Sequence, residues 1–342
     1  MKKFLGIQSG GTICQEKNEN GVYVPVEGDY FYLAPEIYKN GKIDSFPHKA
    51  IDSTNMGTQH RKEITEIVKQ NYLDYDGFVI VQGTDSLAES ASAINYMIQN
   101  SKKPIILTGS QKPIKEYGTD ARDNLYNSFK FASKGLPGVW VVFGDKILRG
   151  SRTVKEHSTD FNAFNSTKQK PFGLIYTKEH YFSLDIERSL ELEEDVSYFT
   201  SFDTGVETYV QNSGNSTNVL ENIVRDDSVK GIVVGGLGVG NIRDEYVDLL
   251  IEARERNKPC VVVTNCQGGS VDMETYEVGA KSSKYVIPGF DLTREAAVQK
   301  LMYSLGKARY GEISKENLFD YVKKIIYTPI GRDITLPKPT SF

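Results

Sequence analysis

The 342-residue chain has few of the residues on which disulfide scaffolds and metal sites depend. Its three cysteines are too few, and odd in number, for a disulfide framework. Its four histidines are scattered, and no His/Cys cluster has the spacing of a metal site. We therefore expect no metal and no other cofactor. The residues concerned are Cys14, Cys260, Cys266, His48, His60, His157 and His180.

The chain also lacks a basic excess and any long hydrophobic run. The net charge is −4 at pH 7 and the pI is near 5.8, which argues against nucleic acid or an anionic membrane as a partner. Only residues 4–7 separate the N-terminal lysines from polar Gln8, far short of the roughly 7–15 apolar residues of a signal peptide. No run approaches the ~18 apolar residues of a membrane span. We expect a cytoplasmic protein.

Three motifs of common enzyme classes are missing as well. Without a G-x-x-x-x-G-K-[ST] phosphate loop or a G-x-G-x-x-G fingerprint, nucleotide binding has no support. No G-x-S-x-G nucleophile elbow occurs either. What the chain offers instead is hydroxyl residues beside glycines.

The remaining composition, 39% hydrophobic and 25% charged, is that of a folded globular protein long enough for two domains. Short apolar runs are typical of buried parallel strands, and they alternate with helical patterns. This alternation predicts right-handed βαβ units and an α/β fold with a doubly wound, mostly parallel sheet. The expected strands are 3–7, 49–51, 77–81, 104–107, 139–143, 231–234 and 259–263, and the expected helices are 87–99, 121–133, 243–255 and 293–305.

A domain boundary is expected where this pattern loosens, between residues 191 and 221, into acidic and Ser/Thr/Asn-rich sequence. We place a larger N-terminal catalytic α/β domain at 1–195 and a linker at 196–205. A smaller C-terminal α/β domain follows at 206–342.

Four expected strands end in short turns rich in glycine, hydroxyl groups or both. Ligands bind beyond the carboxyl ends of strands in open α/β sheets, so four such turns on one edge favour a concave polar site. Each hydroxyl could instead cap a helix, and for Ser53 and Ser86 taken singly capping is the simpler interpretation. The turns are residues 9–12, 52–56, 82–86 and 108–111.

A hydroxyl nucleophile at such a site needs a partner that takes its proton. A buried lysine beside a carboxylate and a second threonine could do this. Lys155 follows the strand expected at 139–143, which places it at the same sheet edge. The sequence alone nevertheless favours a solvated surface lysine at this position.

Two segments resemble the signatures of a known family. Residues 9–13 (SGGTI) and 82–87 (QGTDSL) are similar to the TGGTI and HGTDT motifs of the bacterial-type L-asparaginases, the asparaginase/glutaminase family. The segment YVPV at 23–26 and the missing signal peptide are most similar to the cytosolic type I branch. Further segments that fall in family order are 21–26, 52–56, 108–111, 120–127, 149–155 and 238–241.

The resemblance implies a flavodoxin-like N-terminal domain and a small-molecule substrate: L-asparagine, hydrolysed to L-aspartate and ammonia through a covalent acyl-enzyme without a cofactor. Thr12 would be the nucleophile, and Tyr23, on a loop expected to be mobile, would close over it. Thr84, Asp85 and Lys155 would relay protons and activate water. Backbone N–H groups near Thr12 and Thr84 would meet the oxyanion. The substrate-binding residues would be Gly11, Ser53, Thr54, Gly83, Thr84, Asp85 and, through its carbonyl, Ser110.

Two positions depart from the family pattern. Ser9 replaces the first threonine of one motif, and Gln82 stands where the other motif has histidine. Family homodimers or homotetramers complete the site from a neighbouring subunit, and the candidates here are Asn241, Tyr276 and Glu277. Asn241 could equally cap the helix expected from residue 243.

Three other functions share parts of the pattern. A glutaminase-asparaginase of broader range would use the same residues. The amidase subunit of a tRNA-dependent amidotransferase shares both signatures, but it usually carries an extra N-terminal domain, for which a first signature at Ser9 leaves no room. A non-catalytic amino-acid-binding protein would need no proton relay, so the co-occurrence of Thr12, Thr84, Asp85 and Lys155 argues against it.

Overall fold

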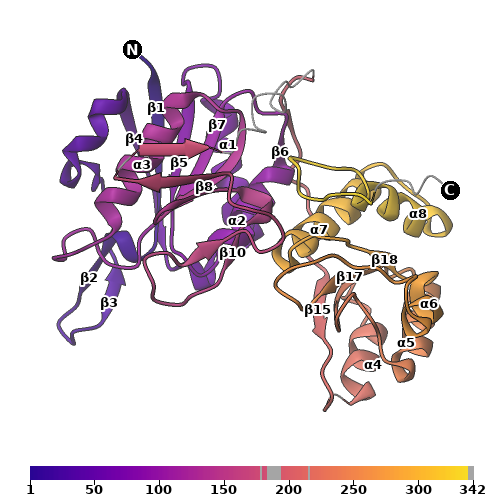
Figure 1. Cartoon of the computed structure of the whole chain (residues 1–342). Helices are drawn as coiled ribbons and strands as arrows, with labels where there is room; N and C mark the ends of the chain where they lie inside the picture. The colour runs from indigo at the N-terminus through magenta and orange to yellow at the C-terminus, as the bar shows by residue number, and fades with distance from the viewer. Residues whose placement is uncertain (178, 183–193, 215, 338–342) are drawn as a thin grey trace. The chain divides into compact units, whose positions relative to one another are not determined.

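The computed structural model describes residues 1–177, 179–182, 194–214 and 216–337 (Figure 1). The chain divides into two compact units, residues 1–166 with 170–200, and residues 167–169 with 201–342. Both units are α/β, so the predicted fold class is confirmed. Within the segment expected to hold the boundary, residues 191–193 and 215 lie outside the described residues, and the linker at 196–205 stays a prediction.

An eight-stranded sheet forms the centre of the first unit, with the strand order β13-β12-β9-β8-β7-β5-β1-β4. The five strands from β8 to β4 are parallel, and β9, β12 and β13 add antiparallel pairs at the other edge. All five strands predicted in this region are present, and the one expected at 49–51 is the end of a longer strand, β4. The strands are β1 (Lys3–Gly10), β4 (Lys42–Ile51), β5 (Gly77–Val81), β7 (Pro104–Thr108), β8 (Gly138–Phe143), β9 (Lys146–Arg149), β12 (Gly173–Tyr176) and β13 (Glu179–Phe182).

The central strands are buried on both faces of the sheet because helices cover each face. On one face, Leu125 and Phe129 of α3 (Ala121–Lys134) join Phe4, Val79 and Trp140 in a single buried cluster. Successive side chains of a strand point to opposite faces of the sheet, so the strand residues that alternate with Phe4, Val79 and Trp140 face the opposite side. There α2 (Leu87–Met97) packs against β7, β8 and α1 (Thr58–Gln70). The helix α2 is buried along nearly its whole length. Its many Ala and Ser residues have small side chains, which let the neighbouring strands and helix approach it closely.

Short elements complete the first unit. The predicted helix 87–99 ends at Met97, because its last two residues form β6 (Ile98–Gln99), which pairs with β14 (Ser197–Tyr198). A hairpin of β2 (Gln15–Lys17) and β3 (Tyr23–Pro25) follows the 3-10 turn η1 (Thr12–Cys14). The pair β10 (Val154–Lys155) and β11 (Phe164–Asn165) follows β9 and the 3-10 turn η5 (Gly150–Arg152). Further 3-10 turns are η2 (Phe31–Leu33), η3 (Pro35–Asn40) and η4 (Ser53–Asn55).

The second unit has a four-stranded parallel sheet in the order β15-β16-β17-β18. Val234 and Val262 pack on one face with α4 and α5, whereas Val233 and Val261 pack on the other face with α7 and α8. The strands are β15 (Val206–Val210), β16 (Gly231–Gly236), β17 (Cys260–Thr264) and β18 (Ile287–Pro288), and the helices are α4 (Thr217–Arg225), α5 (Val247–Glu255), α6 (Glu277–Ser283), α7 (Arg294–Tyr310) and α8 (Lys315–Ile326).

One helix of the second unit starts later than predicted. The helix expected at 243–255 begins at Val247, after a 3-10 turn at Asp244–Tyr246 whose preceding residue, Arg243, makes no side-chain cap. Asn241 instead forms a β-bridge with Leu237. Asn241 is therefore not the helix cap that the sequence allowed.

Two findings concern membrane-spanning and metal-binding proteins, the classes that the sequence argued against. No helix in the described part of the chain is long and apolar enough to cross a bilayer. Among the same residues, no group of three or more His, Cys, Asp and Glu side chains is placed to hold a metal ion.

Candidate active site

The turns after β1, β4, β5 and β7 and the segment after β10 surround one polar pocket of about 200 Å³, which lies within the first unit. Thr12, Ser53, Thr84, Asp85 and Lys155 all line it. Thr12 opens the turn η1 and is partly exposed, whereas Thr84 and Ser53 are buried. The full lining is Gly11, Thr12, Gln15, Asp52, Ser53, Gly83, Thr84, Asp85, Gln111, Lys155 and Ser158.

Glycines let these turns pack backbone against backbone. Gly10 and Gly11 have φ angles of 90° and 87°, which residues with a side chain rarely adopt. A Cβ on Gly11 would lie 2.1 Å from the Gly83 nitrogen, and a Cβ on Gly83 would lie 2.5 Å from the Ser53 Oγ. Protein backbone therefore fills the side of Gly11 on which a side chain would lie, and another side of Gly11 lines the pocket. The Gly11 N–H also donates to the Ile51 carbonyl at 3.1 Å, so it is not an available oxyanion donor.

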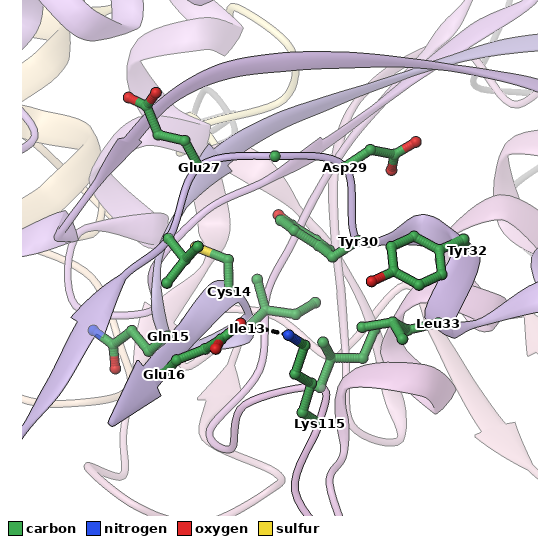
Figure 2. A pocket seen from close by; sticks show the side chains of 13 residues that line it. Ile13, Cys14, Gln15, Glu16, Glu27, Asp29, Tyr30, Tyr32, Leu33 and Lys115 are labelled. Atoms are coloured by element: carbon green, nitrogen blue, oxygen red, sulfur yellow. Dashed lines mark hydrogen bonds and ion pairs between the residues drawn. The ribbon is translucent and has the colours of Figure 1, made fainter. Parts of the chain in front are cut away.

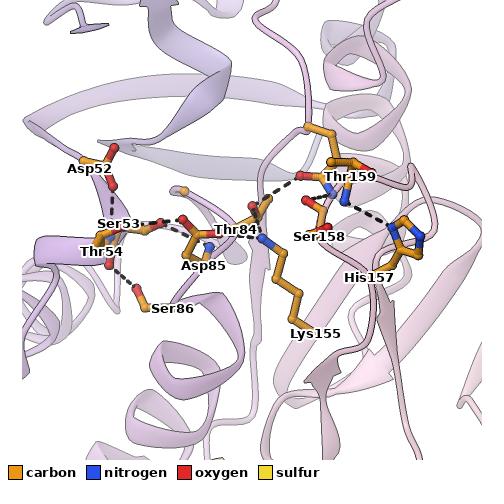
Figure 3. Close-up of polar contacts among 12 residues, drawn as sticks. Asp52, Ser53, Thr54, Thr84, Asp85, Ser86, Lys155, His157, Ser158 and Thr159 are labelled. Carbon is orange, nitrogen blue, oxygen red and sulfur yellow. Dashed lines mark hydrogen bonds and ion pairs between the residues drawn. The ribbon is translucent and has the colours of Figure 1, made fainter. Parts of the chain in front are cut away.

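A lysine, a threonine and an aspartate form the polar centre of the pocket (Figure 3). The Lys155 Nζ donates to the Thr84 Oγ1 at 2.9 Å and to the Asp85 Oδ1 at 2.6 Å. The Lys155 side chain is 18% exposed and the Asp85 side chain 61%. Lys155 is therefore not the solvated surface lysine that the sequence alone favoured, since it joins two side chains about 70 positions away along the chain.

The two serines taken as possible caps have other partners. Asp52, not Ser53, caps η4 by accepting from the Thr54 N–H. The Ser53 Oγ accepts from the Asp85 N–H at 3.1 Å. Ser86 precedes α2 but makes no side-chain cap, and its Oγ donates to the Ser53 carbonyl at 2.7 Å. The capping interpretation is wrong for both serines, because their hydroxyls bind one turn to the other.

Gln82 takes part in a buried polar network behind the pocket. Its Nε2 donates to the Ser90 Oγ at 3.1 Å, and the Arg61 Nε donates to the same oxygen at the same distance. The Arg61 guanidinium also pairs with Glu89 at 2.9 Å, although burial lowers the pKa of Arg61. Ser9 is fully buried, and its Oγ has no hydrogen-bond partner among the described residues. Neither Gln82 nor Ser9 lines the pocket. Arg61 belongs to no motif, so its place in this network could not be predicted from the sequence.

Tyr23 lies on β3, is 38% exposed and does not line the pocket. Its hydroxyl donates to Glu116, and this bond raises the pKa of Tyr23. The structure therefore places Tyr23 away from the pocket that Thr12 lines. The closure of Tyr23 over Thr12 stays a prediction.

A second pocket of about 130 Å³ lies beneath the hairpin that carries Tyr23 (Figure 2). Cys14, Glu16, Tyr30 and Lys115 are among the residues that line it, and Lys115 pairs with Glu16 at 2.5 Å. Burial raises the pKa of Tyr30 well above its usual value, and its hydroxyl has no partner in the described part of the chain. No lysine–threonine pair like that of the first pocket lines this one.

The remaining predicted residues lie as follows. The Thr54 Oγ1 is 3.5 Å from the Asp85 Oδ2, and the buried Ser110 turns its hydroxyl to the Lys112 carbonyl at 2.6 Å. The other three belong to the second unit. There Asn241 follows β16, Tyr276 is 55% exposed at the start of α6, and the Glu277 side chain is 87% exposed.

Sequence reasoning did not assign four residues that line the pocket, which are Gln111, Ser158, Gln15 and Asp52. Gln111 ends one of the quoted strand-end turns, so its position was a usable signal. Ser158 follows Lys155 in a segment without a motif. Gln15 begins β2.

A two-unit α/β fold with hydroxyl groups, a lysine and a carboxylate at the strand ends fits an amidohydrolase with a hydroxyl nucleophile. The family models agree with this class, since the model described as "Asparaginase, N-terminal" matches residues 3–188 and "Glutaminase/Asparaginase C-terminal domain" matches residues 206–318. The chain belongs to the asparaginase family.

Known proteins are similar over almost the whole chain. The L-asparaginase of Thermococcus kodakarensis is 34% identical over 338 residues, which is 97% of this chain and 99% of that protein. L-asparaginase 1 of Escherichia coli K12 is 35% identical over 318 residues, 90% of this chain and 92% of that protein. The solved structure of the thermostable T. kodakarensis L-asparaginase matches with a TM-score of 0.87 at 33% identity, covering 98% of this chain and all of that one. That of a probable cytoplasmic L-asparaginase from Campylobacter jejuni matches with a TM-score of 0.77 at 26% identity, covering 94% and 99%.

Proposed function

We propose that this chain is a cytoplasmic L-asparaginase, which hydrolyses L-asparagine to L-aspartate and ammonia through an acyl-enzyme on Thr12. The observation that carries the proposal is that Thr12 shares one pocket with the hydrogen-bonded Lys155, Thr84 and Asp85. Family membership and the relatives named above support it.

The substrate's two charged groups have matching partners in the pocket. The Asp85 carboxylate is largely exposed and can accept hydrogen bonds from the α-ammonium group. The Ser53 hydroxyl already accepts from the Asp85 N–H, so its own proton is left to donate to the α-carboxylate. Thr54 stands beside Asp85 at the ammonium end. This arrangement would leave the side-chain amide facing Thr12.

In the first step the Thr12 oxygen bonds to the side-chain amide carbon, the carbon–nitrogen bond breaks, and the nitrogen leaves as ammonia with the hydroxyl proton. Water then attacks the resulting ester and releases aspartate and Thr12. The Thr84 hydroxyl passes a proton of this water to Lys155 when the amine is unprotonated, because the two groups lie 2.9 Å apart.

A coupled ammonia assay with L-asparagine and L-glutamine, run on the wild type, Thr12→Ala and Thr12→Ser, tests the proposal. We expect ammonia from L-asparagine, no turnover in Thr12→Ala, and partial activity in Thr12→Ser, which keeps a hydroxyl. Full turnover in Thr12→Ala would refute the acyl-enzyme. Comparable rates on both amides would favour the broader glutaminase-asparaginase, ammonia release only with charged tRNA the amidotransferase subunit, and aspartate binding without turnover the binding protein.

We further propose a homodimer or homotetramer in which Asn241, Tyr276 or Glu277 of a neighbouring subunit completes the site. The exposure of Tyr276 and Glu277 leaves them available to another subunit. Mixing inactive Thr12→Ala chains with chains inactivated at one of these positions tests this, because hybrid oligomers would regain activity only if that residue acts between subunits. Light scattering gives the subunit number.

A further inference from the structure

The Thr84 hydroxyl makes two hydrogen bonds that together fix its proton. It accepts from the Lys155 Nζ at 2.9 Å, and it donates to the Gln111 Oε1 at 3.4 Å. A lysine ammonium donates and cannot accept, so only the Gln111 oxygen can receive the hydroxyl proton in this arrangement. Thr84 is 5% exposed and lines the pocket, so few water molecules compete for either bond.

Gln111 is itself held so that its oxygen faces Thr84. Its Nε2 donates to the Ser158 carbonyl at 3.2 Å and to the Asp160 carbonyl at 3.0 Å, which uses both amide hydrogens. Since carbonyl oxygens cannot donate, rotating the amide to exchange its oxygen and nitrogen would lose both bonds. The backbone N–H of Gln111 donates to both oxygens of Asp120, at 3.1 and 2.9 Å, which fixes the turn after β7.

The two carbonyls that hold Gln111 belong to a compact turn after Lys155. The His157 Nδ1 accepts from the backbone N–H groups of Thr159, at 3.1 Å, and Asp160, at 2.9 Å (Figure 3). The chain segment that supplies Lys155 thus also supplies the anchor for Gln111. Both hydrogen-bond partners of the Thr84 hydroxyl are therefore positioned by this one segment.

We propose that Gln111 is a positioning residue, which accepts the Thr84 proton while Lys155 is an ammonium and so keeps the Thr84 Oγ1 beside the Lys155 Nζ. The inference rests on the proposed function, in which this hydroxyl carries protons between water and Lys155. When Lys155 becomes an unprotonated amine, the hydroxyl proton turns from Gln111 to the amine. Without Gln111, Thr84 loses one of the two hydrogen bonds that hold its oxygen beside Lys155, and fewer side-chain conformations suit the relay. The effect falls on turnover and not on binding, because in the described part of the chain no hydrogen bond joins Gln111 to Ser53 or Asp85, the groups proposed to face the substrate's charges.

Steady-state kinetics of Gln111→Met test the proposal, since methionine is similar in length and lacks the amide. We expect kcat for L-asparagine to fall about tenfold, the order of one neutral hydrogen bond, while KM and the Kd for aspartate stay within twofold. Lys112→Met is the matched control on the same turn, because the Lys112 Nζ donates to the Tyr117 carbonyl and lies 4.0 Å from the half-buried Glu116 carboxylate, neither of which lines the pocket, and its kcat should equal the wild-type value. If Gln111→Met does not fold, Gln111→Asn decides, since the shorter amide cannot reach its carbonyls and Thr84 together.

Two results would overturn the inference alone: a kcat of Gln111→Met within twofold of the wild type, or a loss carried by KM. The second would mean that Gln111 shapes the pocket wall through Ser158. The wild type and Thr12→Ala, run in parallel, separate this failure from that of the proposed function. A wild-type chain without asparaginase activity overturns both.

Discussion

Lys155→Met removes the amine at the centre of the pocket and keeps most of the side chain's aliphatic length. Two hydrogen bonds are lost, the 2.9 Å bond to Thr84 and the 2.6 Å bond to Asp85. Because the Asp85 side chain is 61% exposed, water replaces its lost partner, and we expect a stability change of only about 0–1 kcal/mol. The loss of a proton acceptor in the relay should lower kcat by about 10²–10⁴.

The assay pairs ammonia release at saturating L-asparagine with thermal unfolding. Lys146→Met is a matched control, because Lys146 lies on β9 in the same unit, is 19% exposed and pairs with Asp145 at 3.4 Å. We expect both variants to unfold within about 3 °C of the wild type and only Lys155→Met to lose activity. A wild-type kcat for Lys155→Met across the accessible pH range would refute the relay. A fall in melting temperature above about 10 °C would refute the claim that the lysine serves catalysis and not stability.

Three further perturbations probe buried groups. Lys300 and Asp333 form a 2.7 Å ion pair with both side chains fully buried, so Lys300→Met should cost about 3–5 kcal/mol in urea unfolding; a loss below about 1 kcal/mol would contradict this. Burial, followed by the charge of Lys130, lowers the pKa of His180 to about 4. The unfolded chain then binds the extra proton between about pH 6.5 and 4, so stability falls as pH drops through that range; His180→Gln should flatten this slope in thermal melts, and an unchanged slope would exclude His180 as its source. Tyr30→Phe removes a buried hydroxyl without a partner among the described residues, so stability should stay equal or rise by up to about 1 kcal/mol in the same urea assay, whereas a clear loss would disprove the reasoning.

Buried parallel strands were the most predictable part of the fold, because their apolar runs have no competing interpretation at that length. Less predictable was β4 (Lys42–Ile51), of which the sequence indicated only the last three residues. This strand lies at the edge of the sheet, where Pro47 and charged residues are tolerated. The helix α1 was missed because its buried side includes Arg61 and Thr65, whose burial depends on partners in α2.

Motifs predicted which turns surround the pocket but not the contacts within it. The Thr84–Lys155 bond joins positions 71 apart, and no local pattern specifies such a distance. Gln111 was overlooked for a related reason, since its importance comes from the carbonyls of Ser158 and Asp160, and backbone groups leave no mark in a sequence. The close approach of Gly11 to the Gly83 backbone was also not predicted, because it joins two turns about 70 positions apart along the chain.

The charged and hydroxyl groups of the pocket differ in solvent exposure, and this difference separates the buried proton-relay group from the exposed carboxylate. Thr84 is 5% exposed and is held by Lys155 and Gln111, so its proton is ordered before a substrate arrives. Asp85 is mostly in water, where its ion pair with Lys155 is weak because solvent screens it. Under the proposed function, the substrate's ammonium group would therefore share the Asp85 carboxylate at little cost, and the bound substrate would exclude the water that screened it. Each remaining polar contact strengthens as that water leaves, which places the strongest electrostatics of the site in the complex that reacts.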